Sequence, residues 1–514
     1  MKKLLIFALC AAAPAALNAE QWQILGTRPM GMGGAFVAVA QGPIAQYWNP
    51  GGLVKSSANV SGLEIPVGAN IEMTGGIVKD ASKITDMAAK YSSLKTAQTS
   101  GGAMNADQFA AFAKAVSLMS DMNDPGKGAL AEVAGGVDFK FAKVALSVNN
   151  YTSIGLSPYI DTTNIGLGAG TGVSGITMTG GTMLTDPLDL ATRNTIQGAI
   201  ATMGGYTAIQ TLICGSAGTC LTGVGINSDA LLANALYNQA LAAGQTPTQI
   251  TEAANTMSQY ASQVAPIITA AASGNTYANN TSNLEVKGAA FTEIAAGYAW
   301  NVDKWLHGLS VGGNIKMVNG QTVDNSFRFL SESKTGNAFK MDNPKSSWRP
   351  ALDLGLLWNV NSTYPKFPFS PKVGFVVRNI NSPSFDTNSG GKYDLDRQAR
   401  LGFALNPFRF WTLALDMDVT KNKTPVKGFE SRELSMGTEI NVFNRKAFNI
   451  PLRGGMIKNL AEKTSKMAYT LGTGLNLLYM HFDVSGVVST EKTTLDDKNI
   501  PTKLGVAASF GLLF

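Results

Sequence analysis

The sequence predicts an all-β transmembrane barrel of about 14 antiparallel strands, with an N-terminal plug in its lumen and two helical inserts outside its wall. The chain of 514 residues is only 15% charged and contains 55 glycines, whereas soluble proteins are about 25% charged. Its C-terminal part repeats segments of about ten residues in which apolar and polar side chains alternate. Short and long connections between these segments alternate as well, as in barrels with short turns on one side of a membrane.

Residues 1–19 are expected to be a signal peptide and not part of the fold. Lys2 and Lys3 precede an apolar stretch that runs to Leu17, and Ala19 ends a plausible cleavage site. After it, no uncharged apolar run reaches about 18 residues, so the sequence predicts no transmembrane helix. Export without spanning helices, together with the low charge, predicts an outer-membrane location, with outer-membrane lipid around the barrel.

Charge and motifs argue against nucleic-acid binding and against enzymatic activity. The net charge of +6 is spread along the chain without a basic stripe. The G-x-G-x-x-G match at 170–175 has no preceding strand, and no hydrolase, P-loop or zinc-protease motif is present. The histidines are His307 and His481, and His481 with Asp483 is interpreted as hydrated lumen wall. We therefore predict no catalytic residues, no cofactor and no metal site.

Residues 20–57 are predicted to form the plug. The stretch Gly26 to Leu53 is apolar, but glycine, proline and glutamine interrupt it, so it suits enclosure by other elements. Its glycines permit tight turns and close approach, and Tyr47 to Gly52 reads as a turn into a strand. The alternative is an N-terminal core segment of a soluble domain. The residues expected to form the plug and to meet a ligand are Gly31, Gly33, Gly34, Phe36, Asn49 and Pro50.

The barrel is predicted to occupy residues 58–514, with its helical inserts at about 80–130 and 152–284. Helical spacing at 107–120 marks the first insert, and helical patterns near 187–210, 228–244 and 248–272 mark the second. Cys214 and Cys220 in the second insert are expected to form a small disulfide loop in an oxidising compartment; the alternative is two free thiols.

From residue 286 onward the period of two is sustained, as in Trp411 to Thr420 and Met480 to Val488. Lumen-facing charges are expected in a water-filled interior, and tryptophans are expected to include members of an interfacial girdle. The even strand number predicts that both ends of the mature chain lie on the side of the short turns. The lumen-facing charges are Asp353, Asp416, Asp418, Glu439, Lys316 and Arg378, and the tryptophans are Trp22, Trp48, Trp300, Trp305, Trp358 and Trp411.

The last strand alternates from Leu504 to Phe514 and ends on that phenylalanine. Phe510 and Phe514 are expected to belong to the signal by which outer-membrane barrels are recognised for assembly. The alternative is the edge strand of a soluble sheet, which would be expected to carry charge.

The run Arg28-Pro-Met-Gly-Met-Gly-Gly-Ala-Phe36, followed by Tyr47-Trp48-Asn49-Pro50, resembles the N-terminal segment of the FadL/PorV-like outer-membrane proteins. The strand that passes at once into a helical stretch, residues 77–80 and then 84–94, is most similar to the family named for the conjugal transfer protein TraF. Asn49-Pro50-Gly51 stands where the family commonly has Asn-Pro-Ala.

The resemblance implies a monomeric fourteen-stranded barrel whose N-terminal segment is a luminal hatch. It also implies passage or binding of small hydrophobic compounds such as long-chain fatty acids. The 152–284 insert is larger than a fatty-acid transporter leads us to expect. A second hypothesis is therefore a non-transporting component of a secretion or conjugation apparatus that binds a protein partner through this insert.

Overall fold

The computed structural model describes residues 18–54, 61–79, 106–162, 164, 185–214, 219–272, 281–328, 345–445, 448–495 and 498–514. The predicted signal peptide therefore lies almost wholly outside the described residues. So do the glycine motif at 170–175 and the helical stretch expected at 84–94.

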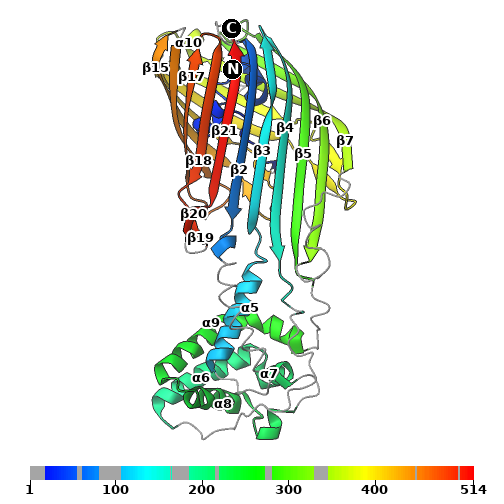
Figure 1. Ribbon diagram of the computed structural model, residues 1–514, viewed down its shortest axis with the longest axis vertical. Coiled ribbons are helices and arrows are strands. Elements are labelled where there is room, and N and C mark those ends of the chain that lie inside the picture. The colour runs from blue at the N-terminus through cyan, green and yellow to red at the C-terminus, as the bar shows by residue number, and fades with distance from the viewer. Residues whose placement is uncertain are drawn as a thin grey trace.

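Antiparallel strands close into one barrel, and the prediction of 14 strands is confirmed (Figure 1). The first and last wall strands, β2 and β21, pair from Gly62–Leu513 to Glu72–Lys503, which leaves the wall without an open edge. The wall strands are β2 (Gly62–Thr74), β3 (Gly128–Phe141), β4 (Val144–Tyr159), β5 (Asn283–Asn301), β6 (Leu309–Arg328), β7 (Lys345–Asn359), β8 (Lys372–Arg378), β11 (Gln398–Phe408), β12 (Trp411–Asp418), β15 (Glu433–Arg445), β16 (Phe448–Asn459), β17 (Ala468–Leu477), β18 (Met480–Ser489) and β21 (Lys503–Leu513).

Short and long links alternate around the barrel as predicted. Residues 142–143 and 478–479 are tight turns, whereas 160–282 joins β4 to β5. The longest of the short links, between β7 and β8, contains the helical turn α10 (Val360–Thr363). All short links lie at one end, which we call the short-link end, and the chain finishes there (Figure 1).

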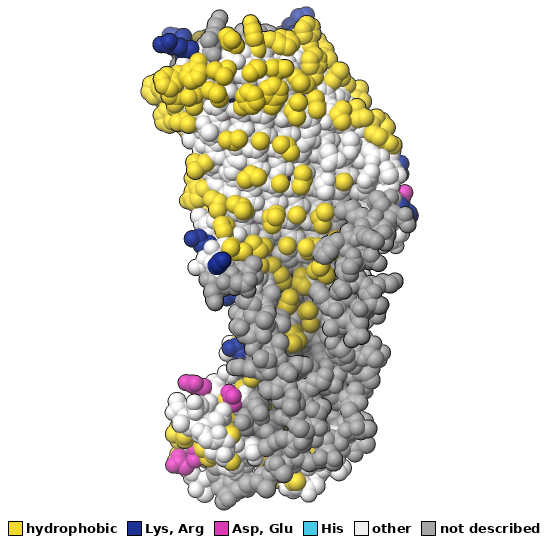
Figure 2. Space-filling model, in the orientation of Figure 1, with side chains coloured by type: hydrophobic (Ala, Val, Ile, Leu, Met, Phe, Trp, Pro, Cys, Tyr) yellow, Lys and Arg dark blue, Asp and Glu magenta, His cyan; other side chains and the backbone are white. Residues whose placement is uncertain are grey.

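The outer face of the wall is apolar. In β21, Leu504 and Val506 are more than half exposed, while Gly505, Ala507 and Ser509 on the other parity are buried toward the lumen. Figure 2 shows hydrophobic side chains over the wall, densest near the short-link end. An apolar wall with aromatic side chains toward one rim is typical of a membrane-spanning barrel. Exposed aromatic residues in or beside the short links include Trp300, Trp305, Phe408, Phe410, Phe443, Tyr479 and Phe514.

The two predicted inserts form one helical domain beyond the long-link end (Figure 1). Helix α5 comes from the first insert and packs against α9 of the second. Phe109 and Met257, one from each helix, are both buried in the shared core. Within the described ranges, no helix is both long and apolar enough to cross a membrane. The helices are α5 (Ala106–Asp121), α6 (Pro187–Thr202), α7 (Gly205–Cys214), η2 (Thr222–Val224), α8 (Asp229–Ala242) and α9 (Pro247–Ala272).

Local sequence explains where these helices begin. The Asp186 carboxylate accepts a hydrogen bond from the Leu188 backbone N–H at 2.8 Å, and Pro187 occupies the first turn of α6.

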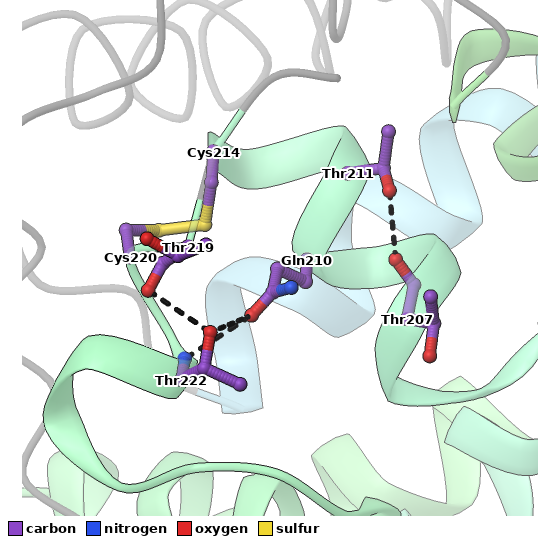
Figure 3. The surroundings of a disulfide bond; sticks show 7 residues. All are labelled: Thr207, Gln210, Thr211, Cys214, Thr219, Cys220 and Thr222. Atoms are coloured by element: carbon purple, nitrogen blue, oxygen red, sulfur yellow. Dashed lines mark hydrogen bonds between the residues drawn. A yellow bond between two sulfur atoms is a disulfide. The ribbon is translucent and has the colours of Figure 1, made fainter. Parts of the chain in front are cut away.

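At the end of α7, Cys214 and Cys220 are joined by a disulfide (Figure 3). Beside it, Gln210 Oε1 accepts hydrogen bonds from the backbone N–H of Thr222 at 3.1 Å and from its hydroxyl at 3.2 Å.

Three small sheets lie in the long links. The strand β1 (Asn18–Glu20) pairs in parallel with β13 (Lys421–Lys423), which also pairs with β14 (Glu430–Ser431). Because β13 lies in a long link, this pairing places Glu20, the expected first residue of the mature chain, at the long-link end. The expectation that both ends of the mature chain lie at the short-link end is therefore wrong for the N-terminal end. The free edge of β13 offers unpaired backbone groups, and these hold β1 at the long-link end. The other two sheets pair β9 (Ser384–Asp386) with β10 (Lys392–Asp394), and β19 (Lys492–Leu495) with β20 (Lys498–Pro501).

The shared core of the helical domain yields a stability prediction. Met257→Ala removes a fully buried side chain, so we expect it to destabilise the helical domain by about 2–5 kcal/mol. Thermal melting followed by helical circular dichroism should show the loss, while the heat-modifiable migration of the barrel on gels should not change. Leu188→Ala is the matched control, because Leu188 is 63% exposed. If Met257→Ala also abolished the heat-modifiable migration, the barrel and the helical domain would not be stabilised independently of each other.

Candidate functional site: the luminal plug

Residues 21–54 run through the lumen and fill its middle. They contain only short helical turns, α2 (Thr27–Gly31), α3 (Ala45–Trp48) and η1 (Pro50–Val54). Almost every side chain in the segment is buried, and α2 contacts β16, β17 and β18 while η1 contacts β5, β6 and β7. The plug therefore touches opposite sides of the wall. The domain boundary at residue 57 falls outside the described residues.

Aromatic rings form the centre of the plug. Trp48 lies 5.9 Å from Trp22, 5.8 Å from Phe36 and 5.7 Å from Tyr47, measured between ring centroids. The polar atoms of two rings are satisfied within the plug: the Tyr47 hydroxyl donates to the Gln23 carbonyl at 2.6 Å, and Trp48 Nε1 to the Leu25 carbonyl at 2.9 Å. Burial raises the pKa of Tyr47 to about 12, so its hydroxyl remains a donor at neutral pH.

Two wall arginines lie over these rings. The Arg378 guanidinium is 3.9 Å from the Tyr47 ring centroid, and that of Arg400 is 4.8 Å from the Trp22 centroid. Each arginine is also paired with a wall carboxylate: Arg378 donates to Glu293 at 3.0 Å, and Arg400 donates to Asp418 at 2.6 Å. The wall carboxylates thus neutralise both arginines, while the planar faces of the two guanidinium groups contact the aromatic rings of the plug.

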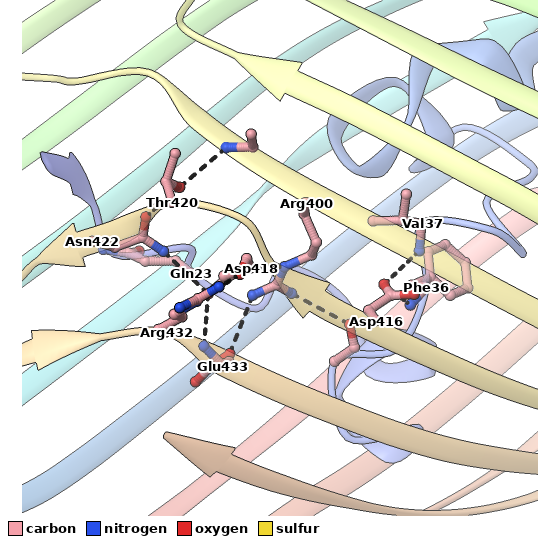
Figure 4. Close-up of polar contacts among 12 residues, drawn as sticks. Gln23, Phe36, Val37, Arg400, Asp416, Asp418, Thr420, Asn422, Arg432 and Glu433 are labelled. Carbon is pink, nitrogen blue, oxygen red and sulfur yellow. Dashed lines mark hydrogen bonds and ion pairs between the residues drawn. The ribbon is translucent and has the colours of Figure 1, made fainter. Parts of the chain in front are cut away.

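Asp416 of β12 holds the backbone of the plug. Its Oδ2 accepts hydrogen bonds from the backbone N–H groups of Phe36 at 2.7 Å and Val37 at 2.8 Å (Figure 4). Beside it, Arg400 donates to the Gly34 carbonyl at 3.4 Å and to Glu433 at 3.3 Å. A carboxylate that accepts two backbone donors fixes both the position and the direction of the segment.

A second attachment is a chain of four charges. Arg28 of the plug donates two hydrogen bonds to Glu439, at 2.8 and 2.9 Å. Arg453 bridges Glu439 at 2.7 Å and Asp483 at 2.6 Å. We call these four side chains the charge quartet. Because it holds two cations and two anions, it is neutral as a group.

The expectation that lumen-facing charges line a water-filled interior is wrong for these strands. Lys316 is buried between the carboxylates of Glu293 at 3.1 Å and Asp353 at 3.0 Å. Asp353, Asp416, Asp418, Glu439 and Arg378 are likewise buried and hydrogen-bonded. The plug occupies the space that water was expected to fill, so each charge needs a protein partner.

The predicted plug residues are all found at its contacts with the wall. Asn49 donates to the carbonyls of Val37 at 3.0 Å and Leu356 at 2.9 Å, and its Oδ1 accepts from the backbone N–H of Gly51 at 3.0 Å. Pro50 lies against Gly312 and Gly355 of the wall. These contacts explain the asparagine of the Asn-Pro-Gly turn, because its one side chain bonds to Val37 and Gly51 of the plug and to Leu356 of β7.

Gly31, Gly33, Gly34 and Phe36 lie on the side of the plug that faces β12, β15, β16 and β17. Gly33 has a φ of +66°, and a Cβ there would lie 2.7 Å from the Met436 carbonyl oxygen. The Gly31 carbonyl accepts a hydrogen bond from Thr470 at 3.0 Å. Phe36 is in the aromatic centre.

The residues predicted for barrel assembly lie on the outer face, and the predicted girdle tryptophans are divided between the plug and the wall. Phe510 packs on Phe482 with ring centroids 4.9 Å apart on the outer face, and Phe514 is 54% exposed there. The Phe514 backbone N–H donates to the Ser61 carbonyl at 2.8 Å. Trp22 and Trp48 are buried in the plug, whereas Trp300 and Trp305 are exposed near the short-link end. The role of Phe510 and Phe514 in barrel assembly, and of Trp300 and Trp305 in the interfacial girdle, stays a prediction.

Sequence reasoning missed a row of wall glycines that we call the glycine belt. A Cβ at Gly437 would lie 2.2 Å from the Met32 carbonyl oxygen, and one at Gly455 would lie 2.5 Å from the Gly33 nitrogen. Glycines on the inward parity of a strand mark close approach by another backbone, and this signal was available in the sequence. The belt pairs Gly312 with Gly355, Gly374 with Gly402, and Gly437 with Gly455 across neighbouring strands, and Gly472 extends it.

A cavity of about 510 Å³ lies between the plug and the short-link end, and we call it the vestibule. Phe36, Val39 and Ile44 of the plug contribute to its lining, as does the charge quartet. Its rim comes from strand ends and short links, namely Asn406, Arg409, Arg445, Asn449, Asn476 and Tyr479. Toward the long-link end, the cavities beside Gln21 and Gln23 are only about 20–30 Å³ each. In the described ranges, no cluster of histidine, cysteine and acidic side chains could hold a metal ion.

Comparison with known proteins gives one family and several similar folds. Residues 46–418 match the family described as the F plasmid transfer operon protein TraF. No curated protein matches the sequence.

Among solved structures, the chain is similar to the Pseudomonas putida toluene transporter TodX, with 10% identity over 97% of this chain and 100% of that one and a TM-score of 0.41. The monoaromatic hydrocarbon channel CymD gives 11% identity over 95% and 97% of the two chains and a TM-score of 0.41. A Pseudomonas aeruginosa FadL homologue gives 9% over 96% and 99%, with a TM-score of 0.39. The barrel fold itself follows from the strand pairing of this chain.

The glycine belt predicts which wall substitutions loosen the plug. Gly437→Val places side-chain atoms where the Met32 backbone lies, so we expect the plug to be displaced and ion conductance in planar bilayers to rise. Gly454→Val is the matched control: Gly454 pairs with Thr438 next to the belt, and a Cβ there would have no neighbour closer than 3.8 Å. Equal conductance of the two variants would show that the belt does not seat the plug.

Proposed function

This chain belongs to the family of the F plasmid transfer operon protein TraF, and from the plug in its lumen we propose that it is an outer-membrane channel for small hydrophobic compounds, long-chain fatty acids among them. The observation that carries the proposal is a plug with an aromatic centre and non-covalent contacts with the wall. The plug is attached by hydrogen bonds, ion pairs and ring contacts, and every one of the described attachments is non-covalent.

The composition of the plug supports apolar cargo. Trp22, Phe36, Tyr47 and Trp48 contact one another across the middle of the lumen. A shift of the plug would expose these rings, and such a surface favours an apolar molecule over a hydrated ion. Tyr151 and Phe291 extend the apolar surface onto the wall, where Tyr47 stacks on Tyr151 with ring centroids 5.2 Å apart.

The closed wall supports action as a monomer in the outer membrane. Because β2 pairs with β21, the barrel needs no second chain to satisfy its backbone. The long links and the helical domain are proposed to be extracellular, since short turns face the periplasm in such barrels.

Removing residues 26–53 should convert the sealed barrel into an open pore with higher conductance in planar bilayers. Unchanged conductance would mean that the plug is not the barrier. In cells, the intact protein should increase uptake of labelled toluene or oleate and leave uptake of labelled glucose unchanged, because only apolar molecules are favoured beside the plug. No increase for either apolar compound, or an equal increase for glucose, would contradict the proposed channel.

A second candidate is a non-transporting component of a secretion or conjugation apparatus, with the helical domain as the part that binds a protein partner. It is favoured by the formation of one domain, with its own core, from two separate links. The described helices of this domain lie beyond the barrel and outside the plug, so a separate role is proposed for them.

The helical domain can be removed only as a whole, since deletion of the second insert alone would expose the apolar side of α5. Replacing both 80–126 and 162–281 by short turns should leave a heat-modifiable barrel. If the second candidate is right, a partner that co-purifies with the intact protein is lost, and the uptake of toluene and oleate is negligible both before and after the deletion. Retention of the partner by the shortened barrel would contradict this role for the domain.

A further inference from the structure

The vestibule has an excess of positive charge. Five basic and three acidic side chains line it. Of these, the charge quartet is neutral, because Arg28 and Arg453 are paired with Glu439 and Asp483. Arg409 and Arg445 at the rim are exposed, and among the described residues neither forms an ion pair with a carboxylate. Two arginines beside one cavity provide the forked donors that bind carboxylate or phosphate.

The remaining polar groups of the vestibule are placed to meet hydroxyl groups. Asn449 donates to Asn441 Oδ1 at 2.8 Å, but its own Oδ1 is buried and has no hydrogen-bond partner. Glu64 on β2 is 7% exposed, and among the described residues its carboxylate forms no hydrogen bond or ion pair. Buried acceptors normally have donors. A ligand hydroxyl would supply one to each.

We propose that the vestibule binds a small hydroxylated organic anion, such as a sugar acid or a sugar phosphate. Arg409 and Arg445 would hold the anionic group, Asn449 and Glu64 would accept hydrogen bonds from hydroxyl groups, and the Tyr479 ring at the rim offers an apolar face for a sugar ring. A volume of about 510 Å³ is within the range of small-molecule sites. This site goes beyond the proposed passage of hydrophobic compounds and does not depend on it.

The test is calorimetric titration of the full chain in phosphatidylcholine nanodiscs, with glucuronate and glucose 6-phosphate as probes. Glucose lacks the anionic group and acetate lacks the hydroxyls, so each should bind at least about tenfold more weakly than glucuronate, as expected from the loss of charge-assisted hydrogen bonds. Binding of glucuronate should also weaken as salt rises, because Arg409 and Arg445 are exposed.

The double variant Arg409→Gln/Arg445→Gln should lose at least about tenfold in glucuronate affinity. Lys366→Gln is the matched control, since Lys366 is an exposed cation in the β7–β8 link and does not line the vestibule. Both variants change exposed side chains, so heat-modifiable migration should be unchanged. The proposal is overturned if glucose or acetate binds as tightly as glucuronate, if no probe binds, or if the double variant binds like Lys366→Gln.

Discussion

The width of the barrel is the constraint on which the rest of the structure depends. About eight strands enclose a lumen that wall side chains can fill, and this wall has 14. The surplus space must hold water or protein, and here residues 21–54 occupy its middle. Charged wall residues therefore lose their water and need partners, which the plug backbone and neighbouring wall residues provide. The burial of Asp416, Lys316 and Arg400 follows from the width of the barrel.

Local patterns were sufficient to predict the wall. The alternation in Leu504–Phe514 and the alternation of short and long links gave strand number, order and closure, because a strand records its two faces in a period of two. The plug could be placed from Gly26–Leu53, since an apolar segment rich in glycine must be enclosed. The packing of α5 on α9 could not be predicted, because it joins residues from separate links and no local period encodes it.

The site was predictable in its location but not in its contacts. Asn49 and Gly33 were expected to be plug residues, but their partners Leu356 and Met436 depend on the register of distant strands. The glycine belt was visible only as scattered glycines. It becomes a continuous seat for the plug once pairings such as Gly437 with Gly455 bring those glycines together.

The charge quartet lies where the plug meets the vestibule. Toward the long links, Phe385 is buried against Phe291 with ring centroids 5.3 Å apart, and the ion pair of Lys503 with Glu72 lies at the same end of the lumen. Toward the short links, the vestibule is polar and basic. Arg28 joins the plug to the vestibule. It belongs to the plug, where its guanidinium lies 5.2 Å from the Phe36 ring centroid, and it also lines the vestibule. An anion in the vestibule would compete with Glu439 for Arg28, whereas an apolar molecule would act on the rings. Charge in the vestibule and apolar contact at the rings therefore act on the same segment.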